Sequence, residues 1–308
     1  LDYLREKELL LVLDSIEHIL EGADLVSKII RRAPGVIVIA TSRERLNLQE
    51  ESVFAVDGLG YPKGEVNSGG KSGQSKKSTD SLDDYSAVEL FRQQARRVYD
   101  DFSLSDGAAP YVVRICQLVE GLPLGVELAA SWTRVRSCRD IAREIEHNID
   151  ILSTDLRNVP ERQRSIRATF EYSWQLLSPE ERDLLARLSV FSGGFRREAA
   201  LQVTGASLSS LLALTDKSLL SRVASDRYDM HALLRQYAHD KLSASPQKQA
   251  ETEIGHARYF AAFLERQRKQ PGCCPADGQR STLDGISLWV SAGASAPRRT
   301  RRRRRSSR

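Results

Sequence analysis

Two uninterrupted apolar runs near the start of the chain constrain its fold more than any other feature. Residues 9–13 (LLLVL) and 36–40 (VIVIA) contain no polar side chain, which is typical of strands buried on both faces of a sheet. Between them, residues 16–32 carry apolar side chains at helical spacing, and Pro34 and Gly35 end that segment. Strand, helix and strand in this order predict a parallel sheet with a right-handed crossover.

The rest of the chain is predicted to be largely helical, after a third strand at 53–56. Helices are expected near 84–100, 108–120, 123–135 and 138–151, in a second group that starts near Arg162 and has a helix start at Ser178, and near 196–204, 207–217, 232–242 and 246–268, with a hairpin at 219–230. Ser178, Pro179 and Glu181 form a helix start in which serine caps and glutamate completes a capping box. The chain is expected to divide into an α/β core at 1–60, a flexible linker at 61–83 and a helical subdomain at 84–158. A winged-helix subdomain at 159–243, the start of a further helical region at 244–270 and a disordered basic tail at 271–308 are expected to follow.

The net charge of +5 belongs to the tail. Residues 271–308 hold nine arginines and two aspartates, which leaves residues 1–270 at a net charge of −2. Positive charge therefore favours nucleic-acid binding by residues 271–308 only, and not by the rest of the chain. The four cysteines show no zinc-site spacing, and no apolar run is long enough to span a bilayer. Residues 1–10 lack the layout of a signal peptide, so we expect a cytoplasmic protein with no membrane partner.

Polar residues follow both early strands. Asp14 comes directly after the first strand, and Thr41, Ser42 and Arg43 follow the second. In an open parallel sheet, ligands bind beyond the carboxyl ends of the strands, where an aspartate can hold a metal-bound water and an arginine can reach a phosphate. Taken singly, the same residues have simpler explanations. Asp14 and Glu17 fit a helix capping box, and Arg43 could pair with Glu44 or Glu50.

Four motifs in order resemble those of STAND-class, NB-ARC-like signalling ATPases of the bacterial transcriptional-activator type. Residues 9–14 resemble a Walker B strand, and residues 40–43 (ATSR) resemble the sensor motif after it. Residues 121–124 (GLPL) are similar to the family's G-x-P motif, and Met230 with His231 is similar to the pair that closes its winged-helix subdomain. The resemblance implies part of a P-loop NTPase sheet followed by helical and winged-helix subdomains.

The resemblance also implies roles for individual residues. Asp14 would be the catalytic residue and would support Mg²⁺. Thr41 and Arg43 would belong to the nucleotide site, with Arg43 sensing the terminal phosphate of ATP. Gly121 and Pro123 would shape the adenine pocket, and His231 would contact the β-phosphate of ADP in the closed form. Pro123 is equally well explained as a first-turn proline, and His231 as a capping histidine.

Two departures from the family pattern affect these expectations. No G-x-x-x-x-G-K-[ST] sequence occurs in the chain, and the nearest string, at 69–72 (GGKS), has the wrong spacing and follows the Walker B-like strand. The resemblance then places the phosphate-binding segment upstream of Leu1 and helical repeats downstream, as missing partners. Ser15 also stands where many relatives have a second acidic residue. We therefore expect a switch fragment that does not bind or hydrolyse ATP well alone and whose full-length form can oligomerise.

Two rival functions come from other classes. One is a regulator that binds DNA through the winged helix or, non-specifically, through the arginine tail. The candidate recognition helix at 207–217 carries no Arg, Asn or Gln to read a base edge, so it is better suited to packing. The other rival is an interaction scaffold that does not depend on nucleotide. The abrupt change of composition after Gln270 also raises the possibility that residues 271–308 are not ancestral sequence.

Overall fold

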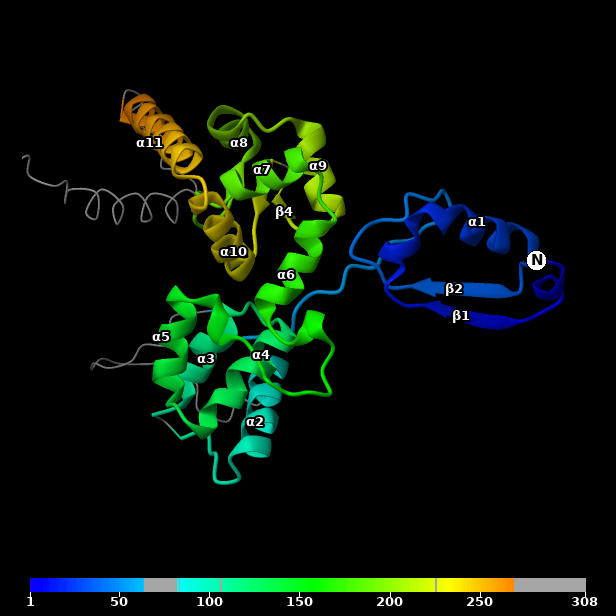
Figure 1. Cartoon of the computed structure of the whole chain (residues 1–308), viewed down its shortest axis with the longest axis horizontal. Coiled ribbons are helices and arrows are strands. Elements are labelled where there is room, and N and C mark those ends of the chain that lie inside the picture. Colours follow the sequence, from blue (N-terminus) through cyan, green and yellow to red (C-terminus); the bar gives the residue numbers. More distant parts are fainter. Residues whose placement is uncertain (64–81, 83, 106, 225, 269–308) are drawn as a thin grey trace, which may run out of the picture.

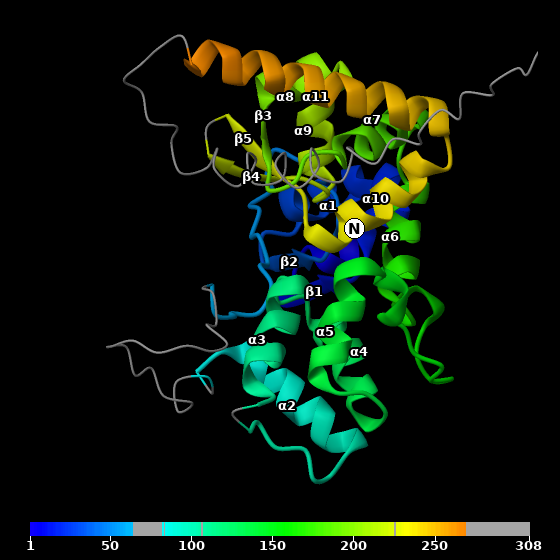
Figure 2. The same ribbon diagram turned by 90° about the vertical axis from the view of Figure 1, so that its left-hand side faces the viewer.

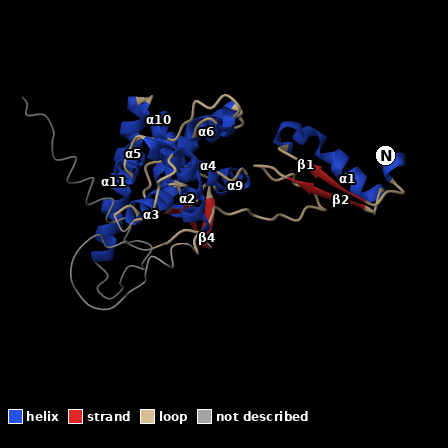
Figure 3. Cartoon of the chain, turned by 90° about the horizontal axis from the view of Figure 1, so that it is seen from below, coloured by secondary structure: helices blue, strands red, loops and turns tan. Residues whose placement is uncertain are grey.

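The computed structural model describes residues 1–63, 82, 84–105, 107–224 and 226–268. Most of the expected linker and the whole expected tail lie outside these residues. The described part is mixed α/β, with mostly helices and two small sheets, as the colouring in Figure 3 shows. No helix in these ranges combines the length and apolar character needed to cross a membrane.

The first sheet has two parallel strands, β1 (Leu9–Leu13) and β2 (Val36–Ala40), paired in register from Leu9↔Val36. The expected helix between them is divided into a 3-10 segment (Ile16–Gly22), in which Ile19 departs from helical geometry, and α1 (Ala23–Arg32). The predicted strand, helix and strand order is confirmed. Figure 1 shows β1, α1 and β2, which together are called the sheet unit, at one end of the molecule.

The expectation that both strands are buried on both faces is wrong. Leu9, Leu11 and Val38 pack toward α1, around a small core of Ile29, Ala33 and Val36. The opposite face is open, and its four side chains are between 51% and 66% exposed (Leu10, Val12, Ile37 and Ile39). The expected strand at 53–56 is also absent, and its apolar side chains are exposed. A single helix covers one side of a two-stranded sheet, and in the part of the chain that the structure describes no strand lies ready to pair with residues 53–56.

The second part begins with four helices: α2 (Ser86–Val98), α3 (Ala109–Leu118), α4 (Pro123–Ser131) and α5 (Cys138–His147). It continues with α6 (Ile166–Gln175), α7 (Pro179–Leu188), β3 (Phe195–Arg196), α8 (Arg197–Thr204), α9 (Leu208–Asp216), β4 (Ser221–Ala224), β5 (Arg227–Asp229) and α10 (Ala232–Ser243). Strands β3, β5 and β4 form an antiparallel sheet, so α7 to β5 have the order of a winged helix. The capping box predicted at Ser178 and Glu181 is present.

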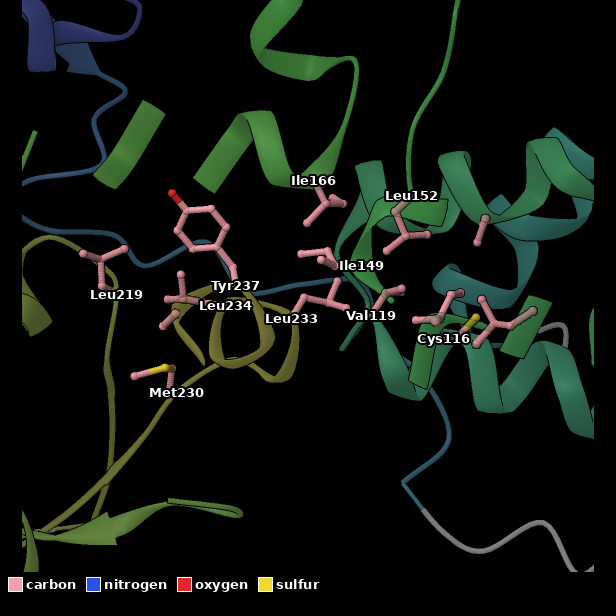
Figure 4. Close-up of a cluster of buried hydrophobic side chains, with 14 of the residues drawn as sticks. Cys116, Val119, Ile149, Leu152, Ile166, Leu219, Met230, Leu233, Leu234 and Tyr237 are labelled. Atoms are coloured by element: carbon pink, nitrogen blue, oxygen red, sulfur yellow. The ribbon is translucent and has the colours of Figure 1, made fainter. Parts of the chain in front are cut away.

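One continuous apolar core joins the α2–α5 helices to the winged-helix region. Figure 4 shows Leu233, Leu234 and Tyr237 of α10 lying between Leu219 and Met230 on one side and the helical subdomain on the other. The labelled residues on that far side are Val119, Ile149, Leu152, Ile166 and, farthest from α10, Cys116. Burial raises the pKa of the Cys116 thiol to about 12, in agreement with a buried, unreactive cysteine.

Helix α11 (Pro246–Arg268) lies against α8 and α10, across one end of the molecule (Figure 2). Its His256 ring lies 5.2 Å from the Phe191 ring and 4.7 Å from the Phe260 ring, between centroids. Burial lowers the pKa of His256 from 6.5 to about 4. The imidazole is therefore neutral at pH 7, and its Nε2 is buried without a partner among the described residues.

Acid should weaken the packing of α11 through this histidine. The unfolded chain takes up a proton near pH 6.5 and the folded chain only near pH 4, so stability is complete above pH 6.5 and is lost as the pH falls toward 4. Between about pH 7 and about pH 5, we expect the unfolding equilibrium constant to rise roughly twentyfold more in the wild type than in His256→Phe. Thermal unfolding at several pH values measures this difference. An equal loss in both proteins would show that other groups cause the acid sensitivity.

Candidate functional site

Asp14 and Thr41 meet at the carboxyl ends of β1 and β2. The Thr41 hydroxyl donates to Asp14 Oδ1 at 2.5 Å and accepts from the Ser15 amide at 2.9 Å. Ser15 is in the left-handed region with φ 57°, and no side chain caps the 3-10 segment after it. Asp14 is thus oriented by Thr41, and the alternative of a capping box with Glu17 is not formed.

Arg43 reaches from the same sheet edge to the helix α6. Its Nη1 donates to the Thr169 carbonyl at 3.2 Å and to Ser173 Oγ at 2.6 Å. The guanidinium carbon lies 4.9 Å from the centre of the Tyr172 ring, within cation–π range. The alternative partners do not include Glu50, which binds Arg31 at 2.6 Å. Arg43 therefore bridges the sheet unit and the helix that leads into the winged-helix region.

Glu17 is the second carboxylate of this edge. Its side chain is 3% exposed, and Oε1 lies 3.8 Å from Arg43 Nε. Oε2 is buried and has no hydrogen-bond partner among the described residues. A buried carboxylate with one loose partner is unusual, because removing it from water costs several kcal/mol.

The G-x-P motif lies in a tight loop before α4. Gly121 has φ +69°, and a Cβ at this position would lie 2.1 Å from the Leu59 carbonyl oxygen. The Leu59 amide donates to the Gly121 carbonyl at 2.8 Å, so the chain leaving the sheet unit is fastened here. Only glycine fits this close approach. Pro123 occupies the first turn of α4, as its simpler explanation predicts.

His231 caps α10 and contacts the same loop. Its Nδ1 accepts from the Leu233 amide at 3.2 Å, which leaves the proton on Nε2 to donate to the Val119 carbonyl at 3.2 Å. Glu120 Oε1 accepts from the Ala232 amide at 2.7 Å. The G-x-P loop and the Met-His pair, which are about 110 residues apart in sequence, therefore meet in space. Glu120 completes this junction and was not identified from the sequence.

The candidate residues thus form two groups. Asp14, Thr41 and Arg43 lie at the sheet edge, while Gly121, Pro123 and His231 lie where α4 meets α10, which Figure 1 shows in a separate part of the molecule. No group of three or more His, Cys, Asp or Glu side chains that could hold a metal ion is found in the described ranges. The structure therefore does not bring the two groups of candidate residues to one point.

Comparisons with known proteins place a winged helix-turn-helix domain at residues 177–243. An HTH-type transcriptional regulator (a provisional name) of Mycobacterium tuberculosis strain H37Rv is 31% identical over 274 residues, covering 85% of this chain and 28% of its own length. An uncharacterized protein of the same strain is 31% identical over 282 residues, covering 87% of this chain and 63% of its own length. The chain thus spans less than two thirds of these relatives.

A solved structure is also similar along most of the chain. It is a Signal Transduction ATPase with Numerous Domains (STAND) protein with a tetratricopeptide repeat sensor, from Pyrococcus horikoshii. The match covers 95% of this chain and 34% of that chain, with 17% identity and a TM-score of 0.32. The winged helix-turn-helix domain matched at residues 177–243 agrees with the order of elements predicted there.

The cap at His231 should contribute to stability in the absence of any ligand. We expect His231→Ala to lower the free energy of unfolding by about 1–2 kcal/mol, because the Leu233 amide loses its acceptor. His231→Asn keeps an acceptor at the N-cap and should lose less than half of that amount. Urea unfolding of the two variants measures the difference. If both variants matched the wild type, the histidine would have no capping role.

Proposed function

We propose that this chain contains the switch region of a STAND-type, ATP- and ADP-dependent regulator of transcription. One observation carries the proposal: Arg43 follows Thr41, whose hydroxyl binds Asp14 at the carboxyl edge of the parallel sheet, and its side chain binds α6, the helix just before the winged-helix domain. A residue in both places can pass the state of a bound phosphate to the winged-helix domain.

The sheet edge suits the charged end of a nucleotide. Asp14, oriented by Thr41, would hold Mg²⁺ through its coordinated water, and Arg43 would bind the terminal phosphate. Ser15 leaves no carboxylate directly beside Asp14 to activate a water, so hydrolysis would be slow. Slow hydrolysis suits a protein that reports which nucleotide is bound. Gly121 and Pro123 would border the adenine, and His231 could turn to a β-phosphate only by giving up its bond to Val119.

Nucleotide binding by this chain alone would be weak. In this class, backbone amides of the G-x-x-x-x-G-K-[ST] loop make most phosphate contacts, and the chain has no such sequence. The exposed face of Leu10, Val12, Ile37 and Ile39 is the surface against which a phosphate-binding segment would pack. In the whole regulator, α11 would begin further helices, and the switch would expose surfaces for oligomerisation.

Calorimetric titration of the full chain with Mg-ATP and Mg-ADP tests this function. We expect dissociation constants weaker than about 1 mM, a binding free energy smaller than about 4 kcal/mol. Any remaining affinity should fall further in Asp14→Ala and Arg43→Ala, whereas Arg31→Ala, in the same sheet unit, should not change it. All variants keep residues 271–308, so binding by the arginines there cancels in the comparison. Micromolar binding that both site variants abolish would show a phosphate cradle without the loop, and binding that neither affects would favour a nucleotide-independent scaffold.

DNA binding is the second candidate, and the winged helix-turn-helix match favours it. The exposed surface of α9 argues for packing instead: Leu208 and Leu212 are 47% and 43% exposed, and Asp216 pairs with Arg45 at 3.3 Å. We expect DNA binding to vanish when residues 271–308 are deleted and to fall steeply with salt before that. Sequence-specific binding that survives the deletion, measured by fluorescence anisotropy, would instead assign recognition to the folded winged helix.

A further inference from the structure

The outer face of α11 carries an apolar stripe that no element in the described part of the chain covers. Its members are all exposed and follow one another at alternating steps of four and three residues: Ala250, Ile254, Ala257, Ala261 and Leu264. The two large side chains, Ile254 and Leu264, are 49% and 40% exposed. Figure 2 shows α11 along the edge of the molecule, with the other described helices on one side of it only. Such spacing is that of the a and d positions of a coiled coil.

The opposite face of α11 accounts for the docking of this helix. Thr252 and Phe260 are buried there, and the His256 ring lies 5.2 Å from the Phe191 ring between centroids. These contacts already fix α11 on the winged-helix region, so the fold of the chain does not require the outer stripe. Exposed apolar surface with a regular pattern is a common mark of a protein–protein contact.

Charges beside the stripe indicate which partner suits it. With Ile254 at an a position, Glu253 falls at a g position and Arg258 at the next e position. In a parallel pair of α11 helices, Glu253 of each copy lies beside Arg258 of the other, so both flanking contacts join opposite charges. An antiparallel pair would instead bring Glu251 beside Glu265, and Arg258 beside its own copy, and these contacts repel. The flanking charges are therefore complementary to a second, parallel copy of α11.

The side chains of the stripe suit the same arrangement. The small Ala257 and Ala261 let two helix axes approach closely at the middle of the stripe, and Ile254 and Leu264 would each pack against their own copy toward its ends. Glu253 accepts from Gln249 Nε2 of its own helix at 2.9 Å, which leaves its negative charge without compensation from that contact. An arginine of a second copy would supply that compensation.

We propose that α11 is a self-association surface: two copies of the chain pair through this stripe, parallel and in register. Such a contact is isologous, because the same residues contribute from both copies. The proposal does not rest on nucleotide binding. From Ala250 to Leu264 the stripe is about 21 Å long, so the contact is small, and the dimer should be weak and dependent on concentration.

Sedimentation velocity on the full chain, over about a hundredfold range of concentration, tests the proposal. We expect the wild type to change from monomer to dimer within this range. Ile254→Glu should raise the dissociation constant of the dimer about tenfold or more, because it places two glutamates against each other in the apolar contact, and Leu264→Glu should act alike. Val135→Glu is the matched control, since Val135 is 62% exposed in the helical subdomain, and it should leave the constant unchanged. Circular dichroism first shows that each variant is folded.

Exchange of the flanking charges tests the orientation. Glu253→Arg sets two arginines side by side and should weaken the dimer about fivefold, whereas Glu253→Arg combined with Arg258→Glu should restore the wild-type constant. Restoration supports the parallel pair, and a combined variant that stays weak overturns it. A wild type that remains monomeric, or a dimer that Ile254→Glu does not weaken, overturns self-association through α11. A dimer lost in Ile37→Glu alone would place the contact on the open face of the sheet unit and overturn the proposal as well.

Discussion

The burial of α10 between the winged-helix domain and the helical subdomain is the interaction on which the rest of the structure depends. Leu233 and Tyr237 are fully buried, and the core they complete runs from α2 to α11. Polar contacts follow the same seam, since His231 reaches Val119 and Arg167 binds both Asp150 and Asp240. Because apolar burial is the dominant favourable term in folding, these helices form one body rather than two loosely linked domains.

The sheet unit is built quite differently. Its separate apolar cluster is small, with Ile29, Ala33 and Val36 buried at its centre, and the other face of the sheet is open. The Leu59 amide after the sheet unit donates to the Gly121 carbonyl, and Arg43 at the edge of the sheet donates to Ser173 of α6. A unit with a small apolar core and few polar contacts to its neighbours is expected to open at a lower free energy than the main core. Elements that move in a protein are commonly found in such regions. The candidate ligand edge therefore lies in the unit with the smaller apolar core.

Much of this architecture could be predicted from the sequence because its signals are local. Apolar periodicity placed the helices, and the Ser178–Glu181 capping box identified the start of α7. What failed depended on neighbours: apolar runs indicate strands, but not whether a second layer covers them, so Leu10 and Ile37 were wrongly expected to be buried. At the site, spacing from the strand ends found Asp14 and Arg43. The partners on α6 could not be found, since Tyr172 and Ser173 meet Arg43 only through the tertiary fold.

Hydrogen exchange on the full chain tests most directly whether one stable body carries a weakly attached sheet unit. The account predicts that amides of α4 and α10 share the highest protection and open together in one cooperative step. Amides of β1 and β2 should exchange through a separate opening of lower free energy. Equal protection in β2 and α10, or separate opening of α4 and α10, would contradict it, because the sheet unit would then be part of the main core or the helical body would not be a single unit.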